Sequence, residues 1–95
     1  MTTIAVRCSG NAPAGWTCRV TLTDGPRPVS SHEVRVRAAD LRRLAPSSSD
    51  PTDLVERSFA FLLERESPGS ILRAFDLMEI ARYFPEYEAT IRGRR

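Results

Sequence analysis

Hydrophobic residues recur every three or four positions between residues 51 and 66, which is the spacing of one face of an α-helix. Pro51 suits the first helical turn, and Ser49 or Asp50 before it is a candidate N-cap. The pattern ends at residues 67–69, Ser-Pro-Gly, because proline lacks an amide proton and glycine relaxes the backbone. The apolar face comprises Leu54, Val55, Phe59, Phe61, Leu62 and Leu63. We expect this helix to anchor the hydrophobic core.

Apolar and polar residues alternate in three segments before this helix, as they do in half-buried β-strands. The segments are residues 3–8, 16–23 and 31–38. They are separated by a loop at 9–15 and by a turn at 24–28, whose two prolines argue against a regular strand there. Short connections favour a three-stranded antiparallel β-sheet, a meander, with one apolar face. The predicted fold class is α+β, with the helices after the sheet packed on that one face.

Shorter helical segments are expected on both sides of the long helix. Asp76 and Glu79 have the spacing of a capping box, in which a residue at the helix start and a glutamate three positions later satisfy free backbone amides. The expected segments are residues 39–44, a turn at 70–75, an amphipathic helix at 77–84 and a final turn at 86–91. We expect all of them to pack on the apolar face of the sheet.

The 95 residues suffice for one domain with a single core. We expect this α+β domain to span residues 1–91 and a basic tail to occupy residues 92–95. No apolar run approaches the roughly 20 residues of a membrane span, and the first ten residues lack the pattern of a secretory signal. These features predict a cytoplasmic protein that makes no membrane contact.

All 14 basic residues are arginine, and the net charge is +2. Four of them, Arg7, Arg19, Arg35 and Arg37, fall on the outward face of the predicted sheet, where Arg19 is expected opposite Arg35. Like charges that face each other across strands are destabilising. The face is therefore interpreted either as a site for anions or nucleic acid, or as a solvated face over which arginine stems lie. It lacks the exposed aromatic residues on which single-stranded nucleic acids stack.

Two cysteines and one histidine are the other candidates for chemistry. Alternation points Cys8 and Cys18 inward, and the expected register places them diagonally, with Cys8 opposite Trp16. A disulfide is compatible with this arrangement, but a cytoplasmic chain would keep both thiols reduced, so buried structural cysteines are expected. His32 lies at a strand end, away from both cysteines and outside any metal-ligand spacing. We predict no catalytic residue, metal or cofactor, and an enzyme is the least favoured class.

Aromatic residues cluster near the C-terminus. Tyr83, Pro85 and Tyr87 are candidate partner-binding residues, because aromatic side chains are enriched at protein interfaces. Alternatively, Phe84 closes the core and the tyrosines lie at its edge. A free edge strand is a second route to a protein partner or a homodimer. The first hypothesis is a small non-enzymatic protein-interaction or regulatory module, and the alternative is nucleic-acid or anion binding.

The stretches LVERSFAFLLERE and SILRAFDLMEIARYFPEYE, together with the preceding SHEVRVRAADLRRLAP, resemble a group of small uncharacterised bacterial proteins. The similarity covers most of residues 30–90. This resemblance implies a bacterial source and a free-standing domain. It implies no activity, ligand or site residue.

Overall fold

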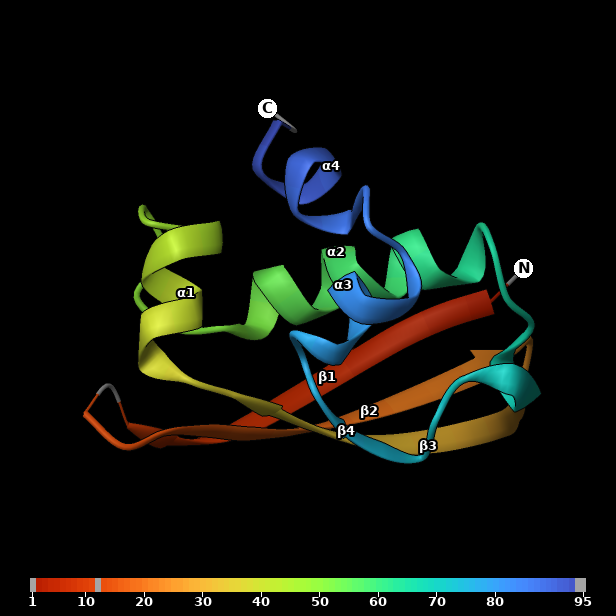
Figure 1. Ribbon diagram of the computed structural model, residues 1–95. Coiled ribbons are helices and arrows are strands. Elements are labelled where there is room, and N and C mark those ends of the chain that lie inside the picture. Colours follow the sequence, from red (N-terminus) through yellow and green to blue (C-terminus); the bar gives the residue numbers. More distant parts are fainter. Residues whose placement is uncertain (1, 12, 94–95) are drawn as a thin grey trace.

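The computed structural model describes residues 2–11 and 13–93. Within these residues a four-stranded sheet is covered on one face by helices (Figure 1). The strands are β1 (Thr2–Asn11), β2 (Gly15–Asp24), β3 (Arg27–Val36) and β4 (Ala74–Asp76). The helices are α1 (Ala38–Leu44), α2 (Thr52–Leu63), α3 (Glu79–Tyr83) and α4 (Tyr87–Gly93), with a 3-10 turn η1 (Pro68–Ser70) after α2. The fold is α+β, as predicted.

The loop between β1 and β2 is shorter than the predicted span of residues 9–15, because both strands extend into it. Gly10 has a φ of 131°, a backbone angle open to glycine, and it continues the strand through a segment whose composition suggested a loop. As a result, the register of β1 against β2 differs from the predicted one. Cys8 lies opposite Cys18, where the sequence had predicted Trp16.

The turn between β2 and β3 is also tighter than predicted. Residues 25–26 form a two-residue turn, and Gly25 adopts the positive φ of 64° that such turns favour. Pro28 lies inside β3, although its presence had argued against a strand. A register shift between Leu22 and Thr23 on the facing strand marks an irregularity there, and prolines are tolerated in strands at such places.

β4 is a strand that the sequence did not predict, because its three residues are too few to show alternation. The predicted turn at residues 70–75 corresponds instead to the end of η1 and the start of β4. β4 pairs in parallel with β3, so the sheet is mixed and its order is β1-β2-β3-β4. The Glu33 amide donates to the Arg73 carbonyl at 2.7 Å, and the Leu77 amide donates to the Arg35 carbonyl at 2.9 Å. This pairing holds the segment after α2 against the sheet.

The core lies between α2 and the sheet. Figure 1 shows α2, the predicted helix of residues 51–66, lying across the covered face. Its side chains Leu54, Val55 and Phe59 are fully buried, as are Val20 and Val34 on the central strands. The apolar face of the helix and the apolar face of the sheet therefore pack together in a single layer, as the helical period and the strand alternation predict.

The predicted capping interactions form in part. The Asp50 carboxylate accepts the Thr52 amide at 2.9 Å, which satisfies one free donor at the start of α2. Before α3, the Glu79 carboxylate accepts the Asp76 amide at 3.3 Å, which is half of the predicted capping box. The Asp76 carboxylate instead accepts from Arg35. The Asp76 side chain therefore pairs with Arg35 of β3 and does not supply the second hydrogen bond of the capping box.

α4 continues to Gly93, so Arg92 and Gly93 belong to a helix, although the sequence placed them in a basic tail. The rest of that predicted tail, residues 94–95, lies outside the described residues. Among the helices of the described residues, none is long and apolar enough to cross a membrane.

Candidate functional site

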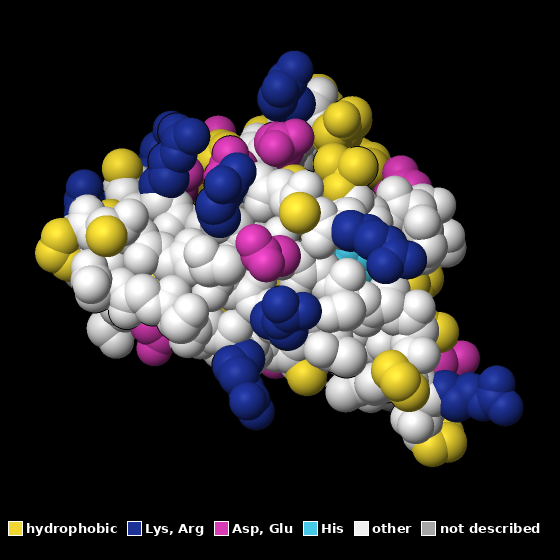
Figure 2. Space-filling model, turned by 90° about the horizontal axis from the view of Figure 1, so that it is seen from below, with side chains coloured by type: hydrophobic (Ala, Val, Ile, Leu, Met, Phe, Trp, Pro, Cys, Tyr) yellow, Lys and Arg dark blue, Asp and Glu magenta, His cyan; other side chains and the backbone are white. Residues whose placement is uncertain are grey.

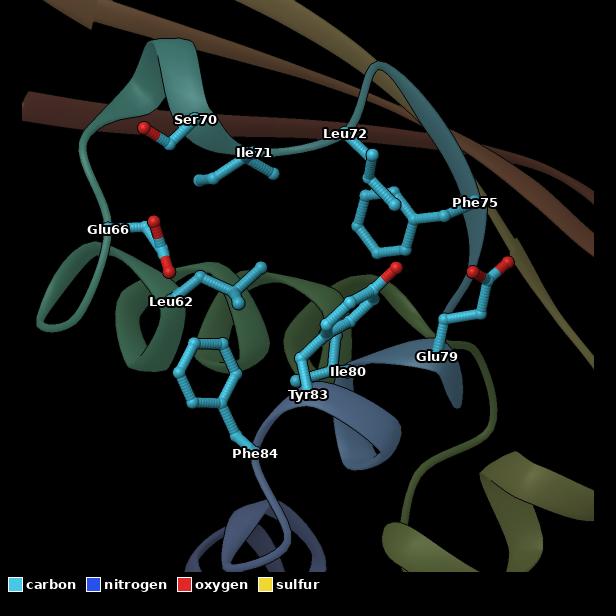
Figure 3. Close-up of a pocket in the computed structure, with 10 residues that line it drawn as sticks. All are labelled: Leu62, Glu66, Ser70, Ile71, Leu72, Phe75, Glu79, Ile80, Tyr83 and Phe84. Atoms are coloured by element: carbon cyan, nitrogen blue, oxygen red, sulfur yellow. The ribbon is translucent and has the colours of Figure 1, made fainter.

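A groove of about 280 Å³ opens between the end of α2, the segment from η1 to β4, and α3 (Figure 3). Its floor consists of the apolar side chains Leu62, Ile71, Phe75 and Ile80, all of which are buried among their neighbours. The groove therefore depends on the unpredicted strand β4, which holds the η1–β4 segment beside α3.

Two large apolar side chains at the groove are exposed to solvent. Tyr83 on α3 is 66% exposed, and Leu72 before β4 is 48% exposed. Figure 3 shows them on opposite sides of the groove. In the part of the chain that the structure describes, Val29 is the only other large apolar residue with comparable exposure. Exposed apolar side chains beside a hollow are a feature that docking sites on proteins share.

A buried histidine holds one edge of this groove. The His32 Nδ1–H donates to the Leu72 carbonyl at 2.7 Å, because a carbonyl can only accept. In the neutral ring, Nε2 then accepts from the Ser30 hydroxyl at 2.8 Å. The imidazole also packs against Phe59, with ring centroids 5.4 Å apart. His32 thus ties Leu72 to both the sheet and α2.

Tyr87 belongs to the core, which corrects the prediction that it faces a partner. Its side chain is fully buried, and its hydroxyl donates to the Ser58 Oγ at 2.6 Å. Ser58 in turn donates to the Leu54 carbonyl at 2.8 Å. Burial raises the pKa of Tyr87 to about 12. Of the other two candidates, Tyr83 lines the groove and Pro85 is exposed beside it in sequence.

The two cysteines form a disulfide between β1 and β2, which corrects the expectation of reduced thiols. The new register explains the difference, because Cys8 and Cys18 face each other directly. Neither sulfur is available to pair with His32 as a nucleophile. Within residues 2–11 and 13–93, no three His, Cys, Asp or Glu side chains come together as metal ligands.

The face of the sheet away from the helices carries basic and acidic side chains interspersed (Figure 2). Arg19 lies opposite Glu33, with 4.0 Å between their charged atoms, and not opposite Arg35 as predicted. On its other side Arg19 lies opposite Arg7. In the described chain, Arg7 has no acidic group within 4.0 Å. The predicted pairing of Arg19 with Arg35 is therefore wrong, and the like-charge pair on this face is Arg7 and Arg19.

Arg35 and Arg37, the other two candidates on this face, both approach Asp76. The distances are 3.2 Å from Arg35 and 4.0 Å from Arg37. Exposed pairs of this kind contribute little to stability. They do reduce the positive charge at the end of the face next to β4. The structure therefore does not gather all four arginines into one uncompensated patch.

No family model, curated protein or solved structure matches this chain. The geometry of its own side chains consequently carries the argument about function.

Sequence reasoning missed most of the groove. Leu72 and Ile71 read as ordinary apolar residues of a turn, and Leu62 as part of the helix face. Glu66 did not indicate a site, because it forms no convincing carboxylate pair with Glu64, Asp76 or Glu79 in the sequence. Tyr83 alone was singled out, through its place in an aromatic cluster. The others become neighbours only when β4 joins β3.

Proposed function

We propose that this protein is a non-enzymatic protein-interaction module that binds an apolar segment of another protein in its groove. The single observation that carries this proposal is the exposure of Tyr83 and Leu72 on opposite sides of an apolar hollow. A tyrosine supplies a large, rigid contact surface at low entropic cost, and such residues dominate the energetics of interfaces.

The construction of the groove also supports binding. Its floor residues are buried in the core, and its edge at Leu72 is held by the hydrogen bond to His32. A site formed in advance loses little conformational entropy when it is occupied, so more of the contact energy appears as affinity. The neighbouring Phe84 packs edge-on against Phe61 of α2, with centroids 5.8 Å apart. This contact holds the α3 side of the groove in place against α2.

A random peptide library displayed on phage tests the proposal. We expect the wild-type protein to enrich peptides with apolar anchors, and Tyr83→Ser or Leu72→Ser to weaken their binding by about tenfold or more. Val29→Ser is the matched control, because Val29 is 52% exposed but does not line the groove. Chemical-shift changes in a titration should fall on groove residues. Peptides that bind equally well to both groove variants would contradict the proposal.

The open sheet face supports a second candidate, the binding of anions or nucleic acid. The observation in its favour is the direct cross-strand placement of Arg7 and Arg19. Such a pair becomes favourable when an anion bridges it. Fluorescence anisotropy of labelled oligonucleotides should then show binding that weakens with salt and is lost in Arg7→Ala/Arg19→Ala, while Arg42→Ala on α1 keeps it. Absence of binding at low salt would exclude nucleic acid.

The compartment in which the module acts stays a prediction. The sequence favoured the cytoplasm, whereas the Cys8–Cys18 disulfide is an argument for an oxidising compartment, because structural disulfides are rare in the cytosol.

A further inference from the structure

We infer that the segment bound in the groove carries a basic side chain on each side of its apolar anchor. This inference rests on the proposed function and names the chemistry of the partner. It follows from two carboxylates, Glu66 and Glu79, which line the same groove as the exposed tyrosine.

The two carboxylates differ from the other half-buried acids of the protein. In the described residues, five acidic side chains are neither fully buried nor fully exposed: Asp40, Glu66, Asp76, Glu79 and Glu88. Asp40, Asp76 and Glu88 each lie within 4.0 Å of an arginine. Glu66 and Glu79 have no arginine within that distance in the same residues. The half-buried acids without a basic partner are therefore both at the groove.

The position of the two acids sets the pattern of the partner. Glu66 follows the end of α2, and Glu79 begins α3. Figure 3 shows them toward opposite ends of the groove, with the apolar floor between them. A segment lying along the groove would place an apolar side chain over Phe75 and Ile80 and one end near each carboxylate. Arginine or lysine at both ends then matches the site.

Desolvation makes this match selective. A bound segment covers the carboxylates and removes part of their water, which is unfavourable for a charge without a partner. Glu79 keeps one hydrogen bond, from the Asp76 amide, and that bond satisfies only part of the carboxylate. A basic side chain replaces the lost water, whereas an acidic one adds repulsion. Charge therefore governs which apolar segments bind.

Three fluorescein-labelled peptides with one shared apolar core, Leu-Phe, provide the test. The core is flanked on both sides by Arg in the first, by Gln in the second and by Glu in the third. We expect the Arg peptide to bind about tenfold or more tighter than the Glu peptide at low salt, and this preference to shrink as salt screens the charges. A fourth peptide, with Ser-Ser between the arginines, should not bind, because charge alone does not fill the groove.

The matched variants separate charge from fold. Glu66→Gln/Glu79→Gln should lower the preference for Arg over Glu to about twofold while the Gln peptide still binds. Glu56→Gln removes the same charge from an exposed position on α2 outside the groove and should leave the preference unchanged. Thermal melts confirm that each variant is folded.

The outcomes distinguish this inference from the proposed function. Equal affinity for the Arg and Glu peptides, with loss of both in Tyr83→Ser, overturns the basic partner and leaves the groove as a binding site. Binding that Tyr83→Ser does not change overturns both. Self-association that Tyr83→Ser abolishes, together with no preference among the peptides, assigns the groove to a second copy and also overturns the inference.

Discussion

Single polar residues organise the interior of this protein. Tyr87, Ser58 and the Leu54 carbonyl form a buried chain of hydrogen bonds that joins α4 to α2. His32 makes an equivalent link from β3 to the segment before β4. Each group has a partner, so burial costs little and the links specify how the elements meet. Tyr87 and His32 both act by fixing how neighbouring elements are placed. Residue type alone does not distinguish this structural role from a role in binding or catalysis.

The buried phenol of Tyr87 predicts a loss of stability at high pH. Its pKa is about 12 in the folded protein against an ordinary 10.0. The unfolded chain therefore releases the proton first, and the free energy of unfolding should fall by at most roughly 3 kcal/mol as the pH rises from 10 to 12.

Urea denaturation at several pH values measures this loss. Tyr87→Phe removes the ionisation and should abolish the Tyr87-dependent part of the fall, while losing about 1 kcal/mol at neutral pH because the hydrogen bond to Ser58 is gone. An unchanged pH profile in Tyr87→Phe would mean that the phenol is not buried.

At the scale of elements, α2 packs against the sheet, including β4, and against α4. Phe59 illustrates this, because its ring is fully buried and contacts both His32 and Phe75, with centroids 5.4 and 6.1 Å away. One face of the helix therefore touches both β3 and the floor of the groove. The pattern of the helix was evident in the sequence, but its neighbours across the core were not.

Phe59→Ala should destabilise the protein by about 3–5 kcal/mol, because it removes a buried ring and leaves a cavity. Chemical denaturation gives this difference directly. Ala60→Ser, at the next and exposed position of α2, is the control and should change the free energy of unfolding by no more than about 0.5 kcal/mol. A small effect of Phe59→Ala would show that the helix face is assigned incorrectly.

At the scale of the whole molecule, the disulfide joins the edge strand β1 to the rest of the sheet. The side chains of β1 that face the helices, such as Ile4 and Val6, are only half-buried. Apolar burial therefore holds this strand less firmly than its neighbours β2 and β3. A covalent link between Cys8 and Cys18, ten residues apart, supplies a constraint that packing does not.

Protein purified without reductant should contain no free thiols, as an Ellman assay reports. Cys8→Ser/Cys18→Ser should lower the free energy of unfolding by about 3 kcal/mol, the value expected for a loop of this size.

Alkylation of the chain inside its native host, before lysis, decides the compartment. Two free thiols there would support the predicted cytoplasm, and their absence would support an oxidising one.

The sequence by itself determined the α+β class, the three-stranded meander, the main helix and much of its apolar face. These features depend on hydrophobic periods of two and 3.6 residues. Such periods are local, so they can be recognised without knowledge of the tertiary arrangement. Of the groove, it indicated only Tyr83.

Only the tertiary structure decided the strand register, β4, the disulfide and the groove. Register depends on turn length, and a shift of one residue in the centre of each hairpin was enough to bring Cys8 opposite Cys18 and Arg19 opposite Glu33. β4 is too short to carry a pattern and exists because β3 offers free backbone groups. The groove needs Leu62 of α2, Leu72 of the segment between η1 and β4, and Tyr83 of α3 to meet. Contacts between residues far apart in the chain leave no local period, so only the folded arrangement reveals them.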